Sequence, residues 1–224
     1  MEPIAEQLHR LRTRLAAAAA LAERPPNAVA LVAVSKTQPV EAIHLAYAAG
    51  QRLFGENRVQ EAAAKFTPLR ANWPDLHLQL IGPLQTNKVA EAVRLFDSIA
   101  TLDRLKLAEA LAQAMARHNR RPSLLIEVNL AAETQKAGIA PTALPAFLHD
   151  CRERLHLPIV GLMCIPPFGH DPRQYFEQLT HLADTHGLPE RSMGMSADFE
   201  VAIACGSTQV RLGTALFGIR PEAP

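Results

Sequence analysis

Short apolar runs alternate along the chain with segments in which apolar positions recur at helical spacing. The segments between the apolar runs predict helices, and one further helix over residues 3–23 precedes the first strand. Such alternation is typical of right-handed βα units and a parallel sheet. The expected strands lie at residues 28–35, 52–55, 76–81, 98–101, 123–130, 158–164, 191–195 and 208–212.

Eight βα units within 224 residues favour a closed barrel over an open sheet. The fold class that we expect is therefore α/β, a single (β/α)8 TIM barrel over residues 1–224, since such barrels commonly reach this length as one domain. The other expected helices occupy residues 39–50, 58–66, 88–96, 103–118, 141–155, 174–186 and 197–204.

Composition narrows the classes of function. The chain is 48% hydrophobic and 20% charged, so it can form a substantial core. Its net charge is +1, and no basic block is longer than Arg120-Arg121. This charge pattern argues against a nucleic-acid-binding function. No apolar stretch approaches the length of a membrane span, and the amino terminus lacks a secretory signal pattern.

Cysteine and histidine usage indicates the compartment and argues against a metal. Cys151, Cys164 and Cys205 are odd in number and widely spaced, which fits a reducing cytoplasm better than a disulfide framework or a zinc site. The histidines form no cluster with ligand spacing, so no metal is expected.

Lys36 directly follows the most apolar short run, residues 28–35. Parallel-sheet proteins bind their ligands at the carboxyl ends of strands. A buried ammonium is costly unless its charge is paired, removed or used, so Lys36 is a candidate for chemistry. The alternative is that Lys36 merely leaves the strand and reaches water.

Glycine and hydroxyl residues follow the seventh and eighth strands, where this barrel usually binds phosphate. They are Gly194-Met195-Ser196 and Arg211-Leu212-Gly213-Thr214. Glycine lets backbone N–H groups approach an anion, and hydroxyls add donors. Ser196 is also a good N-cap for a helix beginning at Ala197. The alternative is that these are ordinary turn glycines and a cap.

A lysine after the first strand and a phosphate cradle after the last two suggest a phosphorylated aldehyde held as a Schiff base. Pyridoxal 5′-phosphate (PLP) meets that description. Asn57 and Gln85, which follow the second and third strands, are candidates for orienting such a ligand, and Asn129 lies at a similar position after the fifth.

Six ordered segments between residues 30 and 220 closely resemble the pyridoxal phosphate homeostasis protein family. They are Ala33–Pro39, Phe54–Glu61, Ile81–Lys88, Gly161–Met163, Ser192–Glu200 and Val210–Gly218. The resemblance implies a barrel like the amino-terminal domain of alanine racemase, with an internal aldimine between Lys36 and PLP. It also implies that Ser196, Gly213 and Thr214 bind the phosphate, helped by the backbone around Met195.

The resemblance places Arg211 at the position that faces the pyridine nitrogen in related racemases, and Asn57 in the motif that lines the pocket. A guanidinium is effectively always protonated and disfavours protonation of the ring nitrogen. The ring is then a weak electron sink, which argues against transaminase-like chemistry. Racemases of this type take a second acid/base from a carboxyl-terminal domain, and this chain ends at Pro224, soon after the eighth strand.

We therefore expect a cytoplasmic, monomeric protein that holds PLP on Lys36 and buffers or delivers it, with apo-enzymes as recipients and no established turnover. The first alternative is a PLP-dependent amino-acid racemase, for which Asn57, Gln85 and Asn129 are poor second bases. A cofactor-free Schiff-base aldolase acting on a phosphorylated sugar is the second alternative.

Overall fold

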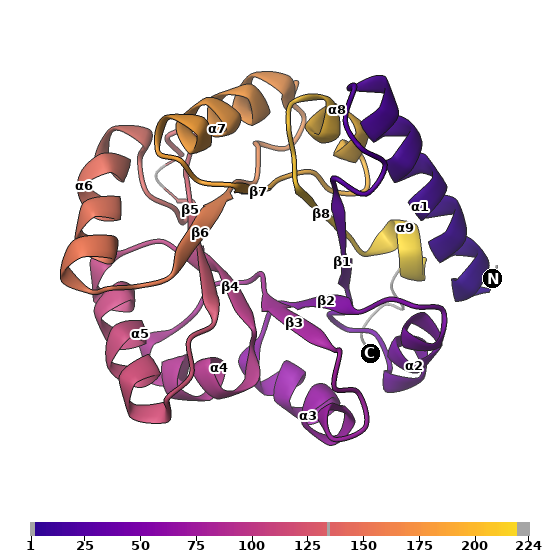
Figure 1. Ribbon diagram of the computed structural model, residues 1–224, viewed down its shortest axis with the longest axis horizontal. Helices are drawn as coiled ribbons and strands as arrows, with labels where there is room; N and C mark the ends of the chain where they lie inside the picture. The colour runs from indigo at the N-terminus through magenta and orange to yellow at the C-terminus, as the bar shows by residue number, and fades with distance from the viewer. Residues whose placement is uncertain (1–2, 134, 219–224) are drawn as a thin grey trace.

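The computed structural model describes residues 3–133 and 135–218, in which eight parallel strands close into a barrel in chain order (Figure 1). Strand β8 pairs with β1, for example Leu212 with Ala33, which closes the sheet. The expected closed (β/α)8 barrel is thus confirmed. The strands are β1 (Ala30–Val34), β2 (Leu53–Glu56), β3 (His77–Leu80), β4 (Ser98–Leu102), β5 (Ser123–Glu127), β6 (Ile159–Met163), β7 (Glu190–Ser192) and β8 (Gln209–Leu212).

Helices surround the barrel on its outer side (Figure 1). The expected helix before the first strand is confirmed as α1, which packs against α2, α8 and α9 and covers the junction of the last and first units. The helices are α1 (Ile4–Leu21), α2 (Val40–Ala48), α3 (Val59–Arg70), α4 (Val89–Leu95), α5 (Leu105–His118), α6 (Leu144–His149), α7 (Arg173–Thr185), α8 (Phe199–Ala204) and α9 (Thr214–Phe217).

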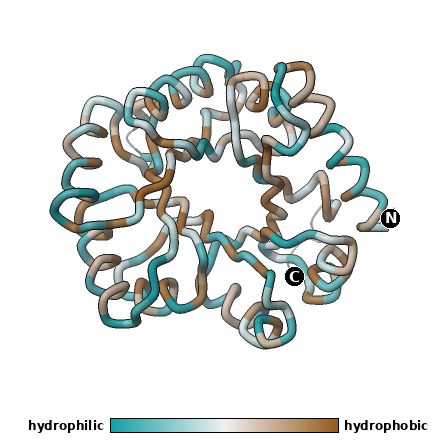
Figure 2. The backbone as a smooth tube through the Cα atoms, in the orientation of Figure 1, coloured by the Kyte–Doolittle hydropathy of each residue, from teal (hydrophilic) through white to brown (hydrophobic). Residues whose placement is uncertain are grey.

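Side chains from the strands form two apolar layers. The larger lies between the barrel and its helices, where the rings of Phe54 and Phe66 are 5.7 Å apart. A small inner cluster of Ala100, Leu125 and Met163 comes from three successive strands. Figure 2 shows hydrophobic stretches along the barrel wall and hydrophilic positions on the outer turns of the helices. Alternate strand residues therefore face the helices and the barrel interior.

The helix after β7 begins later than the sequence predicts. It starts at Phe199 with Asp198 as N-cap, so the expectation that Ser196 caps it is wrong. The Asp198 carboxylate accepts the N–H of Met195 at 2.6 Å, and the Phe199 N–H bonds the Met195 carbonyl at 2.9 Å. This turn occupies the residues that the sequence assigns to the first helical turn.

Other boundaries also differ. The helix expected at 141–155 consists of a 3₁₀ turn (Pro141–Ala143), α6 and a π-helical segment (Asp150–Arg154). The fifth strand ends at Glu127, after which Val128 forms only an isolated bridge with Ile139. Helix α3 continues through Pro68 to the buried Leu69, and α9 was not expected. Residues 1–2, 134 and 219–224, part of the predicted single domain, lie outside the described residues.

In the described ranges, no helix is long and apolar enough to cross a membrane. The same residues contain no cluster of His, Cys, Asp and Glu side chains that could hold a metal ion.

Candidate functional site

A cavity of about 320 Å³ opens at the carboxyl ends of the strands. It brings together the seven residues that the family resemblance assigns to the site, which come from four separate parts of the chain: Lys36, Asn57, Met195, Ser196, Arg211, Gly213 and Thr214. Apolar side chains, including Val34 and Ile81, complete its wall. Contact of each of these residues with a ligand stays a prediction.

Lys36 is directed toward the cavity by strand alternation. Ala33 packs in the outer layer, whereas Val34 lines the cavity. Ser35 therefore faces the helices and Lys36 faces the barrel mouth. The chain then turns sharply, because Thr37 has a φ of 62° and the Gln38 N–H donates to the Ser35 carbonyl at 3.0 Å. Lys36 thus stands, partly buried, at the apex where β1 ends.

Arg211 supplies a fixed cation inside the barrel. It is 5% exposed, and its guanidinium donates to the carbonyl and hydroxyl of Ser192 and to the carbonyl of Cys164, at 2.7, 2.8 and 2.9 Å. Burial lowers the pKa of the Arg211 guanidinium from its usual range, but an arginine remains charged at neutral pH. The cavity therefore has a permanent positive charge.

Small residues and hydroxyls also line the cavity, after β7 and β8. Gly213 is the N-cap of α9, and a Cβ atom at this position would lie 3.3 Å from the carbonyl oxygen of Val34. The Ser196 hydroxyl accepts the N–H of Ala215 at 3.3 Å, so its own hydrogen can be donated elsewhere. Thr214 adds a second hydroxyl. This set of compact donors suits a phosphate group.

Met195 lies in the loop after β7, where the resemblance implies that the surrounding backbone helps to bind the phosphate. Its N–H is already donated to Asp198, so this backbone group is engaged within the loop. The side chain is 37% exposed and lines the cavity. Contact between Met195 and a ligand would therefore involve the side chain or the neighbouring backbone.

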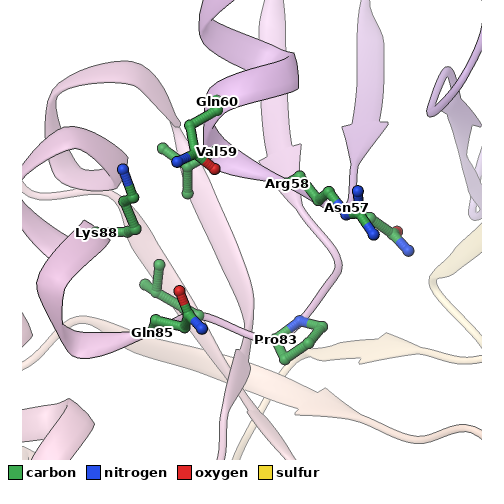
Figure 3. A pocket seen from close by; sticks show the side chains of 8 residues that line it. Asn57, Arg58, Val59, Gln60, Pro83, Gln85 and Lys88 are labelled. Carbon is green, nitrogen blue, oxygen red and sulfur yellow. The ribbon is translucent and has the colours of Figure 1, made fainter.

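Asn57 lies between two hollows. Besides the first cavity it lines a second, of about 570 Å³, with Arg58, Gln85 and Lys88. Figure 3 shows Gln85 and Lys88, from the segment after β3, across from the start of α3. Gln85 therefore belongs to the neighbouring hollow and not to the cavity of Lys36.

Asn129, the other amide candidate, closes its own loop. Its side-chain nitrogen donates to the Glu133 carbonyl at 2.8 Å, and its oxygen accepts the Glu133 N–H at 3.3 Å. Asn129 is not among the residues that line the cavity of Lys36 in the described ranges. The structure assigns it to the loop after β5.

Glu127 is an interior group that the sequence reasoning missed. It lies two residues after Leu125 at the end of β5 and shares its inward face. Burial and Asp103 raise the pKa of Glu127 to about 7, while Arg211 acts in the opposite direction. The sequence signal that could have identified Glu127 is an acidic residue within a mainly apolar run.

Comparisons with known proteins agree with the barrel fold. The profile of the family "Alanine racemase, N-terminal domain" matches residues 7–221. The pyridoxal phosphate homeostasis protein of Pseudomonas aeruginosa is 41% identical over 225 residues, covering 98% of this chain and 97% of that protein. Its counterpart in Escherichia coli strain K12 is 39% identical over 231 residues, covering 98% of each.

A solved structure has the same barrel. PipY of Synechococcus elongatus PCC7942, determined with PLP bound, superposes with a TM-score of 0.84 at 41% identity and covers 96% of this chain and 100% of its own. On the family profile, the relatives and this neighbour, the chain belongs to the pyridoxal phosphate homeostasis protein family.

Proposed function

We propose that this protein binds PLP at the mouth of its barrel, holds it covalently through Lys36 and takes part in keeping the supply of PLP in balance. The observation that carries the proposal is that one cavity contains Lys36 together with Ser196, Gly213 and Thr214. The names of the relatives and the PLP-bound PipY structure support it.

The residues present suit the parts of PLP. Ser196 and Thr214 would hold the phosphate by their hydroxyls, next to Gly213, which presents no side chain. Arg211 would face the ring nitrogen and keep it unprotonated. Lys36 would condense with the aldehyde, so that a C=N bond forms and one water leaves, which requires the neutral amine. Bound PLP supplies a reversible trap for amines and, with an unprotonated ring, a weak electron sink.

Covalent trapping tests this proposal. Apo-protein incubated with PLP should turn yellow, and borohydride should fix the cofactor on the peptide that contains Lys36. Lys36→Ala should remain colourless yet still bind pyridoxine 5′-phosphate, which lacks the aldehyde. Lys106→Ala, at an exposed position on α5, is the matched control. Attachment that maps to another lysine would overturn the assignment.

The proposal extends to the fate of the cofactor. We infer that the protein stores PLP or delivers it to apo-enzymes, and that it acts as a single-domain monomer in the cytoplasm. Labelled PLP on the protein should reach an apo-enzyme faster, or with less loss to free amines, than matched free PLP. Equal transfer and loss would rule out delivery and leave storage. Sedimentation of the protein tests the monomer.

A second candidate function is a racemase-like exchange of the α-hydrogen of an amino acid. The observation in its favour is the Glu127 carboxyl, which has a pKa of about 7 and interacts with Arg211 of the cavity, and an acid/base works best near the operating pH. Among the described residues, Glu127 itself does not line the cavity. Deuterium exchange into an amino acid should then exceed that with free PLP and be lost in Glu127→Gln and Lys36→Ala. Exchange equal to that with free PLP would exclude this function.

A further inference from the structure

Residues on both sides of Lys36 are bound to charged side chains behind the cavity. The hydroxyl of Ser35 donates to Glu56 Oε1 at 2.7 Å. On the other side of Lys36, the N–H of Thr37 donates to Glu61 Oε1 at 2.5 Å. The turn that carries Lys36 is therefore fixed to the end of β2 and to the first turn of α3.

Lys65 joins these contacts into one group. Its ammonium donates to the Ser35 carbonyl at 2.8 Å, to Glu56 at 3.0 Å and to Glu61 at 2.6 Å. An ammonium has three hydrogens, so these acceptors use its full capacity. The side chains of Glu56, Glu61 and Lys65 are 0%, 26% and 11% exposed. Such shielding strengthens charge-assisted bonds and makes removal of one partner costly.

The sequence brings these charges to one place. Glu56 ends β2, and Glu61 and Lys65 are four residues apart on α3, so they share a helix face. Ser35 points toward that face because strand residues alternate in direction. The Glu61 bond also stabilises Thr37 at φ 62°, a conformation that is costly for a β-branched residue.

We propose that Glu56, Glu61 and Lys65 are positioning residues for Lys36: they hold the turn of residues 35–37 so that the Lys36 amine stays directed into the cavity. The inference rests on the proposed function, because it takes Lys36 as the attachment residue. None of the three residues lines the cavity in the described part of the chain. They therefore act through the backbone, without contact with the cofactor.

A positioning role differs measurably from general stabilisation of the fold. Misplacing a reacting group slows bond formation but leaves reversible binding of the rest of the ligand intact. A merely structural defect would both slow covalent attachment and weaken reversible binding. The rate of covalent attachment and the affinity for pyridoxine 5′-phosphate separate the two cases.

Glu61→Ala is the main test, because it removes the acceptor of the Thr37 N–H. Apo-protein mixed with PLP should attach it about tenfold more slowly than the wild type, by absorbance and by borohydride-fixed occupancy of Lys36. Affinity for pyridoxine 5′-phosphate should stay within about twofold, since its contacts are unchanged. Glu61→Gln keeps an acceptor oxygen and should restore most of the rate. Glu41→Ala, an exposed first-turn acid on α2, should match the wild type.

Ser35→Ala provides a second route if Glu61→Ala does not fold. It removes only the bond to Glu56 and should slow attachment about threefold. The inference is overturned if the folded variants attach PLP at the wild-type rate, or if they lose attachment and pyridoxine 5′-phosphate binding in equal measure. By contrast, wild-type attachment away from Lys36 would overturn the proposed function itself.

Discussion

Arg211 donates from a single terminal nitrogen to both the carbonyl and the hydroxyl of Ser192, at 2.7 and 2.8 Å. Its other terminal nitrogen donates to the Cys164 carbonyl at 2.9 Å. The cation of β8 is thereby bound to β7 and to the residue that follows β6. Because the side chain is 5% exposed, its orientation toward the cavity is set by the barrel and not by the ligand.

Arg211→Lys should weaken both the fold and the site. A lysine has one nitrogen on a flexible stem and cannot bond both Ser192 and Cys164 in the geometry of a guanidinium. We expect a loss of about 1–3 kcal/mol in the free energy of unfolding, measured by urea denaturation. We also expect weaker PLP binding in a spectroscopic titration. Arg117→Lys, exposed on α5, should change neither quantity. If Arg211→Lys kept the stability and PLP affinity of the wild type, the role assigned to Arg211 in the fold and the site would be contradicted.

Glu127 should make the free energy of unfolding depend on pH. Its pKa is about 7 in the folded protein, against the ordinary value of 4.5, so between these values the folded state binds more protons than the unfolded state. Its contribution to stability is then present below about pH 4.5 and is lost as the pH rises through 7. Urea denaturation between pH 5 and 8.5 should show wild-type stability falling relative to Glu127→Gln.

The matched control for this pH dependence is Glu153→Gln, because Glu153 is exposed. Its stability should run parallel to that of the wild type across the pH range. If the free energy of unfolding of Glu127→Gln also ran parallel to that of the wild type, the protonation of Glu127 would not be linked to folding in this pH range.

Local patterns in the sequence predict those parts of the site that follow from strand direction. Lys36 follows an apolar run, and Arg211 lies within one. Because the strands are parallel, the carboxyl ends of both strands meet at one end of the barrel. The start of α8 was not predictable in this way, because the Asp198 carboxylate competes with Ser196 for the turn. Contacts between Lys65 and Ser35 join residues thirty positions apart, and no local periodicity specifies such a pair. The pKa of Glu127 likewise depends on Asp103, from the segment after β4, and on Arg211, from β8.

Ser196→Ala should mainly affect ligand affinity. The hydroxyl accepts a long bond of 3.3 Å from Ala215, so its loss should cost about 1 kcal/mol or less in unfolding. A phosphate donor would be lost at the same time. Calorimetric titration with pyridoxine 5′-phosphate should therefore show an affinity lower by about threefold to tenfold. Thr185→Ala, which removes an exposed hydroxyl on α7, serves as control, and equal affinities in the two variants would exclude Ser196 from the phosphate site.

Gly82→Ala should disturb Asn57 through the backbone. A Cβ atom at residue 82 would lie 2.3 Å from the Asn57 carbonyl oxygen, and backbone yields less readily than a flexible side chain. We expect a loss of about 1–3 kcal/mol in unfolding, as for overpacked sites, together with weaker PLP binding. Gly213→Ala is the informative comparison, because its nearest backbone contact is the less severe 3.3 Å to Val34. A larger loss of stability in Gly213→Ala than in Gly82→Ala would contradict this ranking.

Arg58 and Lys88 should accelerate the approach of anionic ligands. They line the hollow beside Asn57, and no carboxylate is among the described residues that line it. Positive charge beside a binding cavity raises the association rate of an anion, and salt screens the effect. The double variant Arg58→Gln, Lys88→Gln should therefore bind PLP more slowly in stopped-flow mixing at low salt, with a smaller dependence on ionic strength and an unchanged dissociation rate. The double variant Arg117→Gln, Arg121→Gln, at exposed positions before β5, controls for the loss of two positive charges. An unaltered salt dependence in the double variant would mean that PLP reaches Lys36 without passing these cations, since steering acts on the path of approach and not on the bound state.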